Sequence, residues 1–251
     1  MIRVESEHLD FAAERIPTSW RRRVLGALRG RMAPRVLRTR DLAAITSLIR
    51  GEANELAVAR MIATLCGDGH LRRVWKGLYV NMLAVPPVIP EEVAASLRRD
   101  AVVSLQSVLG DRVANNPSTV VTAVVPIRRN APIPSVGEVK TDFGVFRFHA
   151  MAEDIFTAGA LEDRLDQTRP RYARATAERA FCDYLYFSQT RRRSLPPPPM
   201  DIDISELRMP VVRRLAKCMG VSNTLEIWCK RKIEHDSEAS IISQASADLG
   251  F

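Results

Sequence analysis

The chain has 251 residues, of which 46% are hydrophobic and 26% are charged, and its formal net charge is +8. This length and apolar content exclude wholesale disorder and suit one large domain or two ordinary ones. The positive charge is concentrated at the front: residues 15–81 hold fourteen Lys and Arg against four Asp and Glu, a net +10, whereas residues 82–251 hold twenty-two against twenty-one. Such asymmetry indicates a polyanionic partner for the N-terminal portion.

Three helices are predicted within the basic portion. The first opens near residues 16–19 and carries an apolar stripe that begins at Trp20. The second spans residues 39–47, where Thr39 is expected to cap the first-turn amides, and residues 48–51 are expected to break the helical period. The third follows directly and ends at a glycine-rich turn.

The third helix, predicted over residues 52–66, presents two different sides at about 100° per residue. The side expected to pack inward holds Leu56, Ala59, Ile62, Ala63 and Cys66. The side expected to meet a DNA groove holds Ala53, Ala57, Arg60, Met61 and Thr64. Arg60 and Thr64 lie one turn apart there and can donate to base edges or phosphates. Glu52 and Glu55, which would repel phosphates, favour the alternative of an ordinary solvated helix.

Two β-prone runs, residues 71–74 and 78–81, flank a turn at Gly77 and predict a basic hairpin. Helices followed by a hairpin in this order are typical of a winged helix-turn-helix, which we predict over residues 15–83. The residues expected to bind DNA are Arg40, Arg50, Asn54, Arg60, Thr64, Arg72, Arg73 and Lys76. Arg60 and Thr64, with Asn54 nearby, are expected to read the major groove. The three cations of the hairpin are expected to hold phosphates or the minor groove, and Arg40 and Arg50 the flanking backbone.

Residues 84–90, AVPPVIP, are kept extended by their prolines and are predicted to form a hinge. Residues 90–251 then predict a mixed α/β domain, so the expected class for the whole chain is α+β. The predicted helices are 91–99, 102–109, 176–188, 210–219 and 223–234, and the predicted strands are 119–127, 136–140 and 142–151.

Few residues are candidates for a catalytic or metal-binding site. Glu138-Val139-Lys140 matches half of a metal-dependent nuclease site, in which the carboxylate would bind Mg²⁺ and the lysine would steady the attacked phosphate. Asp111 is the candidate for the second acid, and a salt-bridged strand edge is the alternative. The four histidines lie far apart, and His149 is expected to be buried and hydrogen-bonded. We expect no catalytic site, no metal and no cofactor.

The four cysteines are widely spaced and form no Cys-x-x-Cys pair, so buried free thiols are expected rather than disulfides or zinc ligands. No apolar run approaches the roughly 20 residues that a membrane-spanning helix needs. The first residues carry acids where a signal peptide would be apolar. We therefore expect a cytoplasmic protein with no membrane partner.

Four segments occur in a recognisable order over roughly residues 15–190. They are KGLYVN at 76–81, AVVSLQSVL at 101–109, FGVFRFH at 143–149 and RATAERAFCDYLY at 174–186. Together they resemble the AbiEi family, the antitoxins of bacterial abortive-infection toxin–antitoxin pairs. The last segment has Ala177-Glu178-Arg179 where the family usually has Pro-Glu-Lys, so a role that needs that lysine does not carry over.

The resemblance implies an N-terminal domain that binds inverted repeats in double-stranded promoter DNA and represses its own operon. It also implies a C-terminal domain that opposes a nucleotidyltransferase-type toxin, usually without a tight stable complex. Arg171, Arg174 and Arg179 form a basic cluster there, which is either a partner surface or a solvated helix face. Two other hypotheses stay open: a winged-helix transcription factor whose second domain senses a ligand or dimerises, and a Mg²⁺-dependent nuclease.

Overall fold

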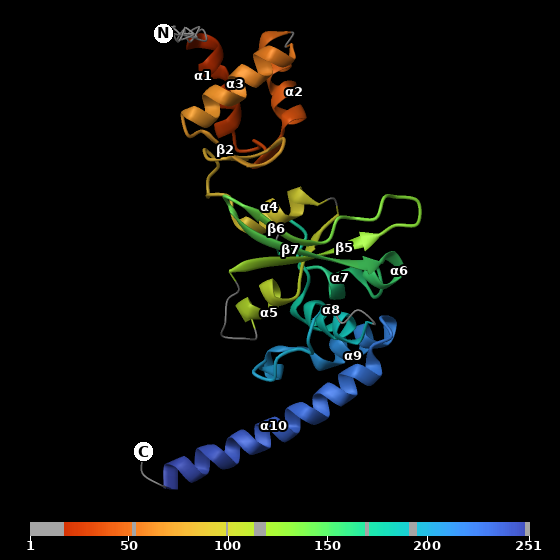
Figure 1. The fold of residues 1–251 in the computed structure, drawn as a ribbon. Helices are drawn as coiled ribbons and strands as arrows, with labels where there is room; N and C mark the ends of the chain where they lie inside the picture. The colour runs from red at the N-terminus through yellow and green to blue at the C-terminus, as the bar shows by residue number, and fades with distance from the viewer. Residues whose placement is uncertain are drawn as a thin grey trace, which may run out of the picture. The chain divides into compact units, whose positions relative to one another are not determined.

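The computed structural model describes residues 18–51, 54–98, 100–112, 119–168, 171–190 and 195–248. The chain divides into two compact units between Val88 and Ile89, within the proline-rich segment (Figure 1). Each unit combines helices with its own sheet. The α+β class predicted from the sequence is therefore confirmed.

The N-terminal unit contains three helices and a three-stranded antiparallel sheet. Its elements are α1 (Thr18–Arg29), β1 (Val36–Arg38), α2 (Thr39–Arg50), α3 (Glu55–Gly67), β2 (Leu71–Trp75) and β3 (Leu78–Asn81). The strand order is β1-β3-β2, so β3 is central and β2 and β3 form the predicted hairpin. Strand β1 was not predicted, because at three residues it is too short to show a strand period.

Helix α2 begins at Thr39 as predicted, but its capping residue and its end differ from the prediction. Arg38, and not Thr39, is the N-cap residue, and its backbone N–H donates to Asp41 Oδ2 at 2.7 Å. The helix continues through the residues expected to break it and ends at Arg50, because the next residue, Gly51, has a φ of +83° that continues no right-handed helix.

The core of the N-terminal unit lies between the three helices and the inner face of the sheet. Its buried residues are Val24, Leu28, Leu37, Leu42, Val58, Met61, Ile62, Leu65, Leu71 and Tyr79. The buried side chain of Asn81 closes one end, where its Nδ2 donates to the carbonyls of Leu28 at 2.8 Å and Pro34 at 3.2 Å. These bonds satisfy a buried amide and tie β3 to the end of α1 and to the segment that follows it.

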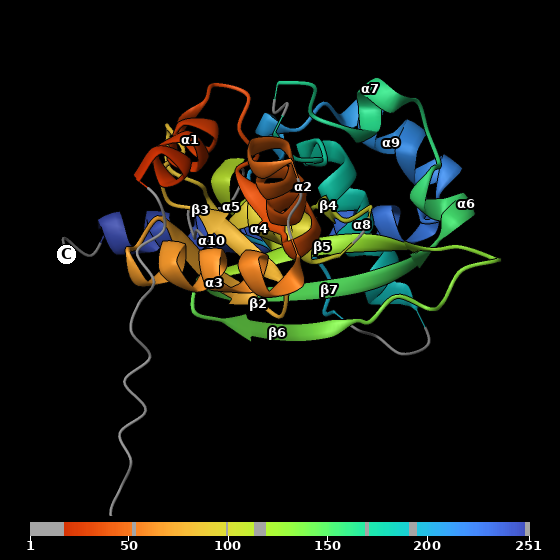
Figure 2. The ribbon, with the colours of Figure 1, turned by 90° about the horizontal axis from the view of Figure 1, so that it is seen from above.

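The C-terminal unit is built on a mixed four-stranded sheet of order β4-β5-β7-β6 (Figure 2). Its elements are α4 (Pro90–Leu97), β4 (Val102–Val103), α5 (Gln106–Arg112), β5 (Val120–Ile127), β6 (Gly137–Thr141), β7 (Gly144–Ala152), α6 (Glu153–Phe156), α7 (Leu161–Arg164), α8 (Ala177–Gln189), the 3-10 helix η1 (Ile204–Glu206), α9 (Met209–Cys218) and α10 (Ser222–Asp248). Strands β5 and β7 pair in parallel, and β6 pairs antiparallel with β7.

The helix predicted over residues 102–109 is wrong in its first half and correct from Gln106 onwards. Residues 102–103 pair with β5 as the short strand β4, in the register Val102↔Val124. Leu105 then takes a φ of +58°, and helix α5 begins only at Gln106. A run of apolar residues cannot by itself distinguish a buried strand from a buried helix. Here residues 102–103 form a strand because they pair with β5.

Strand β5 is buried along residues 121–126, although its side chains alternate between two faces. Figure 1 shows the reason: α4 covers one face of the sheet, and α5 and α8 cover the other. Phe181 of α8 is fully buried and meets Trp228 of α10 edge-on, with 4.9 Å between the ring centroids. Helix α10 extends well past the predicted end at residue 234, because no glycine or proline interrupts it.

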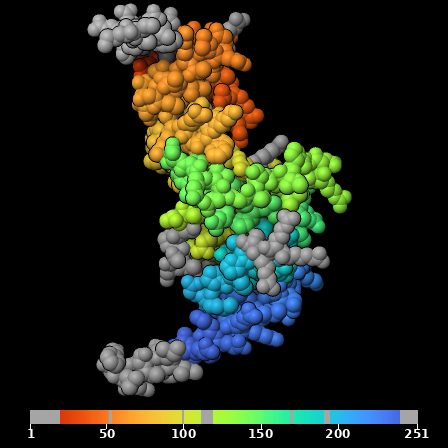
Figure 3. Space-filling view, viewed as in Figure 1, coloured from red at the N-terminus to blue at the C-terminus, as the bar shows by residue number. Residues whose placement is uncertain are grey.

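The loop between β5 and β6 projects from the C-terminal unit (Figure 3). Near its base, Arg128 pairs with Asp100 at 2.9 Å and with Glu153 at 3.7 Å. Farther along, the side chains of Ile133 and Val136 are exposed. The loop is therefore held at its base while its apolar side chains face solvent.

His149 of β7 is 8% exposed, and its ring centroid lies 5.1 Å from that of Phe187. The predicted burial is correct, but the predicted hydrogen bond is not formed at Nε2, which has no partner among the described residues. Burial, aided by the charge of Arg147, lowers the pKa of His149 to about 4. The folded protein therefore holds this ring neutral.

Acid is expected to destabilise the fold through His149. A histidine in the unfolded chain titrates near pH 6.5, so the neutral ring contributes its full stability above that pH and loses it as the pH falls towards 4. A shift of this size corresponds to about 3 kcal/mol. We expect His149→Phe to flatten the loss of unfolding free energy between pH 7 and pH 4.5, measured by urea titration at each pH. An identical pH dependence in both proteins would contradict this assignment.

Candidate nucleic-acid interface

Helix α3 buries a different side from the one predicted. Its buried residues are Val58, Met61, Ile62 and Leu65. Met61, expected on the open side, is 1% exposed, whereas Ala59 and Ala63, expected in the core, are exposed. The prediction failed because alanines carry little apolar area, so the larger Val58, Met61 and Leu65 decide which side packs inward.

The open side of α3 is apolar along its middle. Leu56, Ala59 and Ala63 are exposed at positions i, i+3 and i+7, and we call them the α3 strip. Exposed Glu55 borders the strip at the start of the helix, and exposed Arg60 borders it on the side away from the core. The surface expected to read DNA by hydrogen bonds is therefore mainly a surface of small and apolar side chains.

Two polar residues predicted to read bases are engaged with the backbone of α3. The side-chain oxygen of Asn54 caps the helix by accepting from the N–H of Ala57 at 2.7 Å. This cap sets the helix start at Glu55, later than the predicted residue 52, and residues 52 and 53 lie outside the described residues. The hydroxyl of Thr64 donates to the carbonyl of Arg60 at 3.0 Å.

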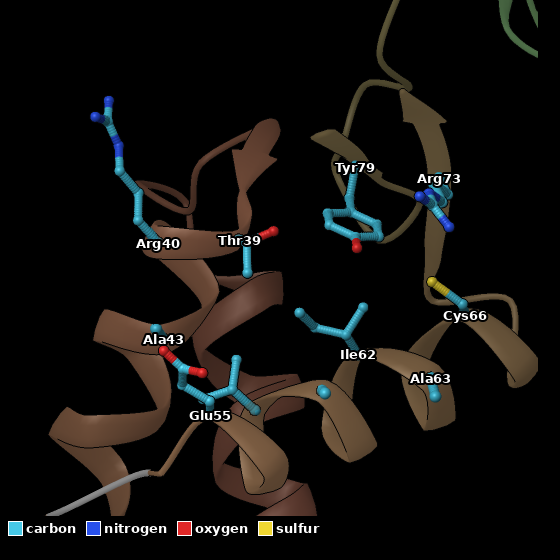
Figure 4. Close-up of a pocket in the computed structure, with 11 residues that line it drawn as sticks. Thr39, Arg40, Ala43, Glu55, Ile62, Ala63, Cys66, Arg73 and Tyr79 are labelled. Carbon is cyan, nitrogen blue, oxygen red and sulfur yellow. The ribbon is translucent and has the colours of Figure 1, made fainter. Parts of the chain in front are cut away.

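A pocket of about 710 Å³ lies between the start of α2, the open side of α3 and the sheet (Figure 4). Most of its lining is apolar. The lining residues are Thr39, Arg40, Ala43, Glu55, Val58, Ala59, Ile62, Ala63, Cys66, Arg73 and Tyr79. The hydroxyl of Tyr79 points from β3 towards α3, Arg73 lies beside it on β2, and Arg40 points away from the pocket (Figure 4).

The two adjacent arginines of β2 project to opposite faces of the hairpin. Arg73 pairs with Tyr79, which belongs to the inner face, and Arg72 pairs with Val80 one position along. Only Arg73 lines the pocket. Its charge reaches Cys66 at the end of α3, where burial raises the pKa of the thiol and Arg73 partly offsets that effect. Lys76 is exposed in the hairpin turn.

Arg40 and Arg50 lie at opposite ends of α2, about 15 Å apart along the helix. Arg40 is exposed at the pocket rim, with its Nε 3.7 Å from Asp41 Oδ1. Arg50 lies over the ring of Trp20, 5.4 Å from its centroid. The structure therefore brings Arg40, Arg73 and the open side of α3 to one place, and leaves Arg50 and Arg72 elsewhere.

The arginine cluster proposed for the C-terminal unit is not a surface cluster. Arg171 is exposed, but Arg174 and Arg179 are each 4% exposed. Arg179 donates from Nε to Asp183 Oδ1 at 2.7 Å, and Asp183 also accepts from the hydroxyl of Ser104 at 2.6 Å. These two arginines therefore belong to the interior of the unit, and neither a partner surface nor a solvated helix face describes them.

The nuclease half-site is a salt-bridged strand edge. Glu138 accepts from Arg147 at 2.8 Å and lies 3.4 Å from Lys140 Nζ, and both cations hold the pKa of Glu138 below its usual value. The side chain of Asp111 lies outside the described residues. Among the residues that are described, no three His, Cys, Asp or Glu side chains gather as a metal ion would require.

The four cysteines are free, as predicted, but only Cys182 is buried as expected. Cys66 and Cys229 are half-buried, and Cys218 is exposed. Within the described ranges, no helix combines the length and the apolar character needed to cross a membrane.

Comparison with known proteins gives a fold but no family. No protein-family model matches the sequence, and no curated protein matches it. Among solved structures, the chain is similar to the RV2827C protein from Mycobacterium tuberculosis, with a TM-score of 0.50 and 14% sequence identity. The match covers 82% of this chain and 73% of that chain. At this identity the likeness shows a shared fold and says nothing about activity.

Proposed function

We propose that the protein binds double-stranded DNA through its N-terminal unit, acting as a winged helix-turn-helix. One observation carries the proposal: the open side of α3 and the Arg73 side of the β2–β3 hairpin border the same pocket, in the portion of the chain with a net charge of +10. In this arrangement α3 enters the major groove and the hairpin contacts the adjacent backbone.

The placement of the cations supports this geometry. Arg73 stands on the hairpin side of the α3 strip, and Arg60 stands on the other side. The major groove is about 12 Å wide and is bordered by a phosphate backbone on each side. A helix whose uncharged middle is flanked by arginines matches that pattern, and exposed Arg40 and Lys76 extend the positive surface along the backbone.

The two arginines of β2 provide a matched test. Arg73→Ala is expected to lower the slope of log affinity against log salt by about 0.9, because one phosphate contact is lost. Arg72→Ala removes the same charge from the opposite face and is expected to leave the slope unchanged. The measurement is fluorescence anisotropy of a promoter duplex from the protein's own operon at several salt concentrations. Absence of binding by the unaltered protein, or equal slopes for the two variants, would contradict the proposal.

The AbiEi resemblance extends this proposal to a biological role. We infer that the protein represses its own operon by binding promoter inverted repeats, and that its C-terminal unit opposes a nucleotidyltransferase-type toxin. In support, the three later segments of the resemblance each contribute a fully buried side chain to the C-terminal unit: Leu109 of α5, Phe146 of β7 and Phe181 of α8. Residues that carry the resemblance are thus the residues that build the unit.

Co-expression with the neighbouring gene tests the antitoxin role. If that gene is toxic alone, growth is expected to recover when the full chain is supplied, without a stable complex being required. Failure of rescue by a chain that still binds its promoter would favour the alternative of an ordinary winged-helix transcription factor. Mg²⁺-dependent cleavage of DNA, lost in Glu138→Ala, would favour the nuclease.

A further inference from the structure

We propose that the α3 strip recognises thymine through its 5-methyl group, so that the preferred DNA site carries thymines where it faces Ala59 and Ala63. The proposal rests on the DNA-binding function proposed above and assigns the chemistry of base reading within it. It concerns the mostly apolar pocket beside α3. The side chains predicted to hydrogen-bond to bases do not explain why this surface is apolar.

The middle of the open side of α3 offers no hydrogen-bonding side chain. Asn54 uses its side-chain oxygen to cap the helix, and Thr64 donates its hydroxyl to the carbonyl of Arg60. Between the flanking charges of Glu55 and Arg60 there remain the side chains of the α3 strip. A base edge placed there meets carbon, and thymine alone presents a methyl group to the major groove.

The pocket gives that methyl group a complementary surface. Ala59 and Ala63 are short enough for a base edge to approach the helix closely, and Ile62, 7% exposed, adds apolar lining between α3 and Tyr79 (Figure 4). A guanine or adenine at the same place would bring its N7 acceptor against alkyl groups and leave it without a donor. The surface therefore favours thymine both by attraction and by the penalty on purines.

The opposite wall suits the sugar-phosphate chain of the same strand. The side chain of Tyr79 is 8% exposed, its hydroxyl points into the pocket, and no partner for that hydroxyl occurs among the described residues (Figure 4). Arg73 lies beside it with no ion-pair partner in the described part of the chain. A phosphate placed there would accept from both groups while the attached thymine faces α3.

The test removes single methyl groups from the DNA. A randomised duplex library is first selected with the full chain, and each thymine of the recovered sequence is then replaced by uracil. We expect affinity to fall about fourfold at one or two positions of each half-site, the equivalent of one methyl group no longer buried. In Ala63→Gly the uracil penalty is expected to vanish at one of these positions and to persist at the others.

A matched variant controls for the cost of glycine in a helix, which is about 1 kcal/mol of stability. Ala44 is exposed on α2 and does not line the pocket, so Ala44→Gly is expected to keep every uracil penalty. If no duplex is enriched, the proposed DNA binding itself fails. If a duplex is enriched and bound, but uracil is tolerated everywhere or Ala63→Gly keeps every penalty, DNA binding stands and thymine reading by the α3 strip is overturned.

Discussion

Replacing Arg179 by alanine is expected to lower the free energy of unfolding by about 3–5 kcal/mol, because the buried carboxylate of Asp183 loses its ion-pair partner. Arg179 and Asp183 are 4% and 3% exposed, and their Nε–Oδ1 distance is 2.7 Å. The guanidinium also donates from Nη1 to the carbonyl of Ala158 and from Nη2 to that of Ile155, each at 3.0 Å. One side chain thus joins α8 to the chain around α6.

Three further variants test the role of Arg179. Arg179→Lys keeps the charge, but an ammonium group lacks the planar set of donors with which the guanidinium binds one carboxylate and two carbonyls. We therefore expect a loss of unfolding free energy smaller than that of Arg179→Ala. Arg171→Ala, on an exposed arginine nearby in the sequence, is expected to change stability by less than about 0.5 kcal/mol. The double variant Arg179→Ala/Asp183→Ala should lose less than the sum of its single variants, measured by urea unfolding. Additive losses would contradict a direct pair.

The parts of the fold predicted well are those with a long, regular pattern. Helix α8 was expected over residues 176–188 and spans Ala177–Gln189, because its apolar residues keep helical spacing from Ala177 to Leu185 and Thr176 caps it. Strand β5 was predicted to within a residue from its run of valines. The pairing of β4 with β5 was not predictable in the same way, since it depends on a partner far away in the sequence.

The candidate site was predicted in outline and not in detail. The basic hairpin and the helix before it were located correctly, since turn residues and charge are local properties. The side of α3 that faces outward was not predicted correctly, because it depends on the packing of α3 against α2 and the sheet. Likewise, the sequence predicts the same DNA-binding role for Arg72 and Arg73. Only the register of β2 against β3 shows that their side chains project to opposite faces of the hairpin.

Placing a carboxylate at the centre of the open side of α3 is expected to reduce DNA affinity by about 100-fold or more, the largest effect on binding that we predict. Ala63 is exposed and lines the pocket, so Ala63→Glu should leave the fold intact while setting a negative charge against the groove. Like charges brought together in an interface cost several kcal/mol, and each 1.4 kcal/mol is a tenfold change in affinity. Anisotropy titration of the promoter duplex, with thermal unfolding as a check on folding, measures both quantities.

Two substitutions show whether the loss comes from charge, from size or from the lower net charge of the unit. Ala63→Gln adds the same bulk without charge and is expected to lose less than Ala63→Glu, because only the close approach of the helix is prevented. Ala27→Glu makes the same change of net charge at an exposed position of α1 and is expected to stay within a few-fold of the unaltered protein. Equal losses for Ala27→Glu and Ala63→Glu would mean that overall charge, and not the open side of α3, determines binding. Because α3 is the element proposed to enter the groove, that result would require a different DNA-binding surface.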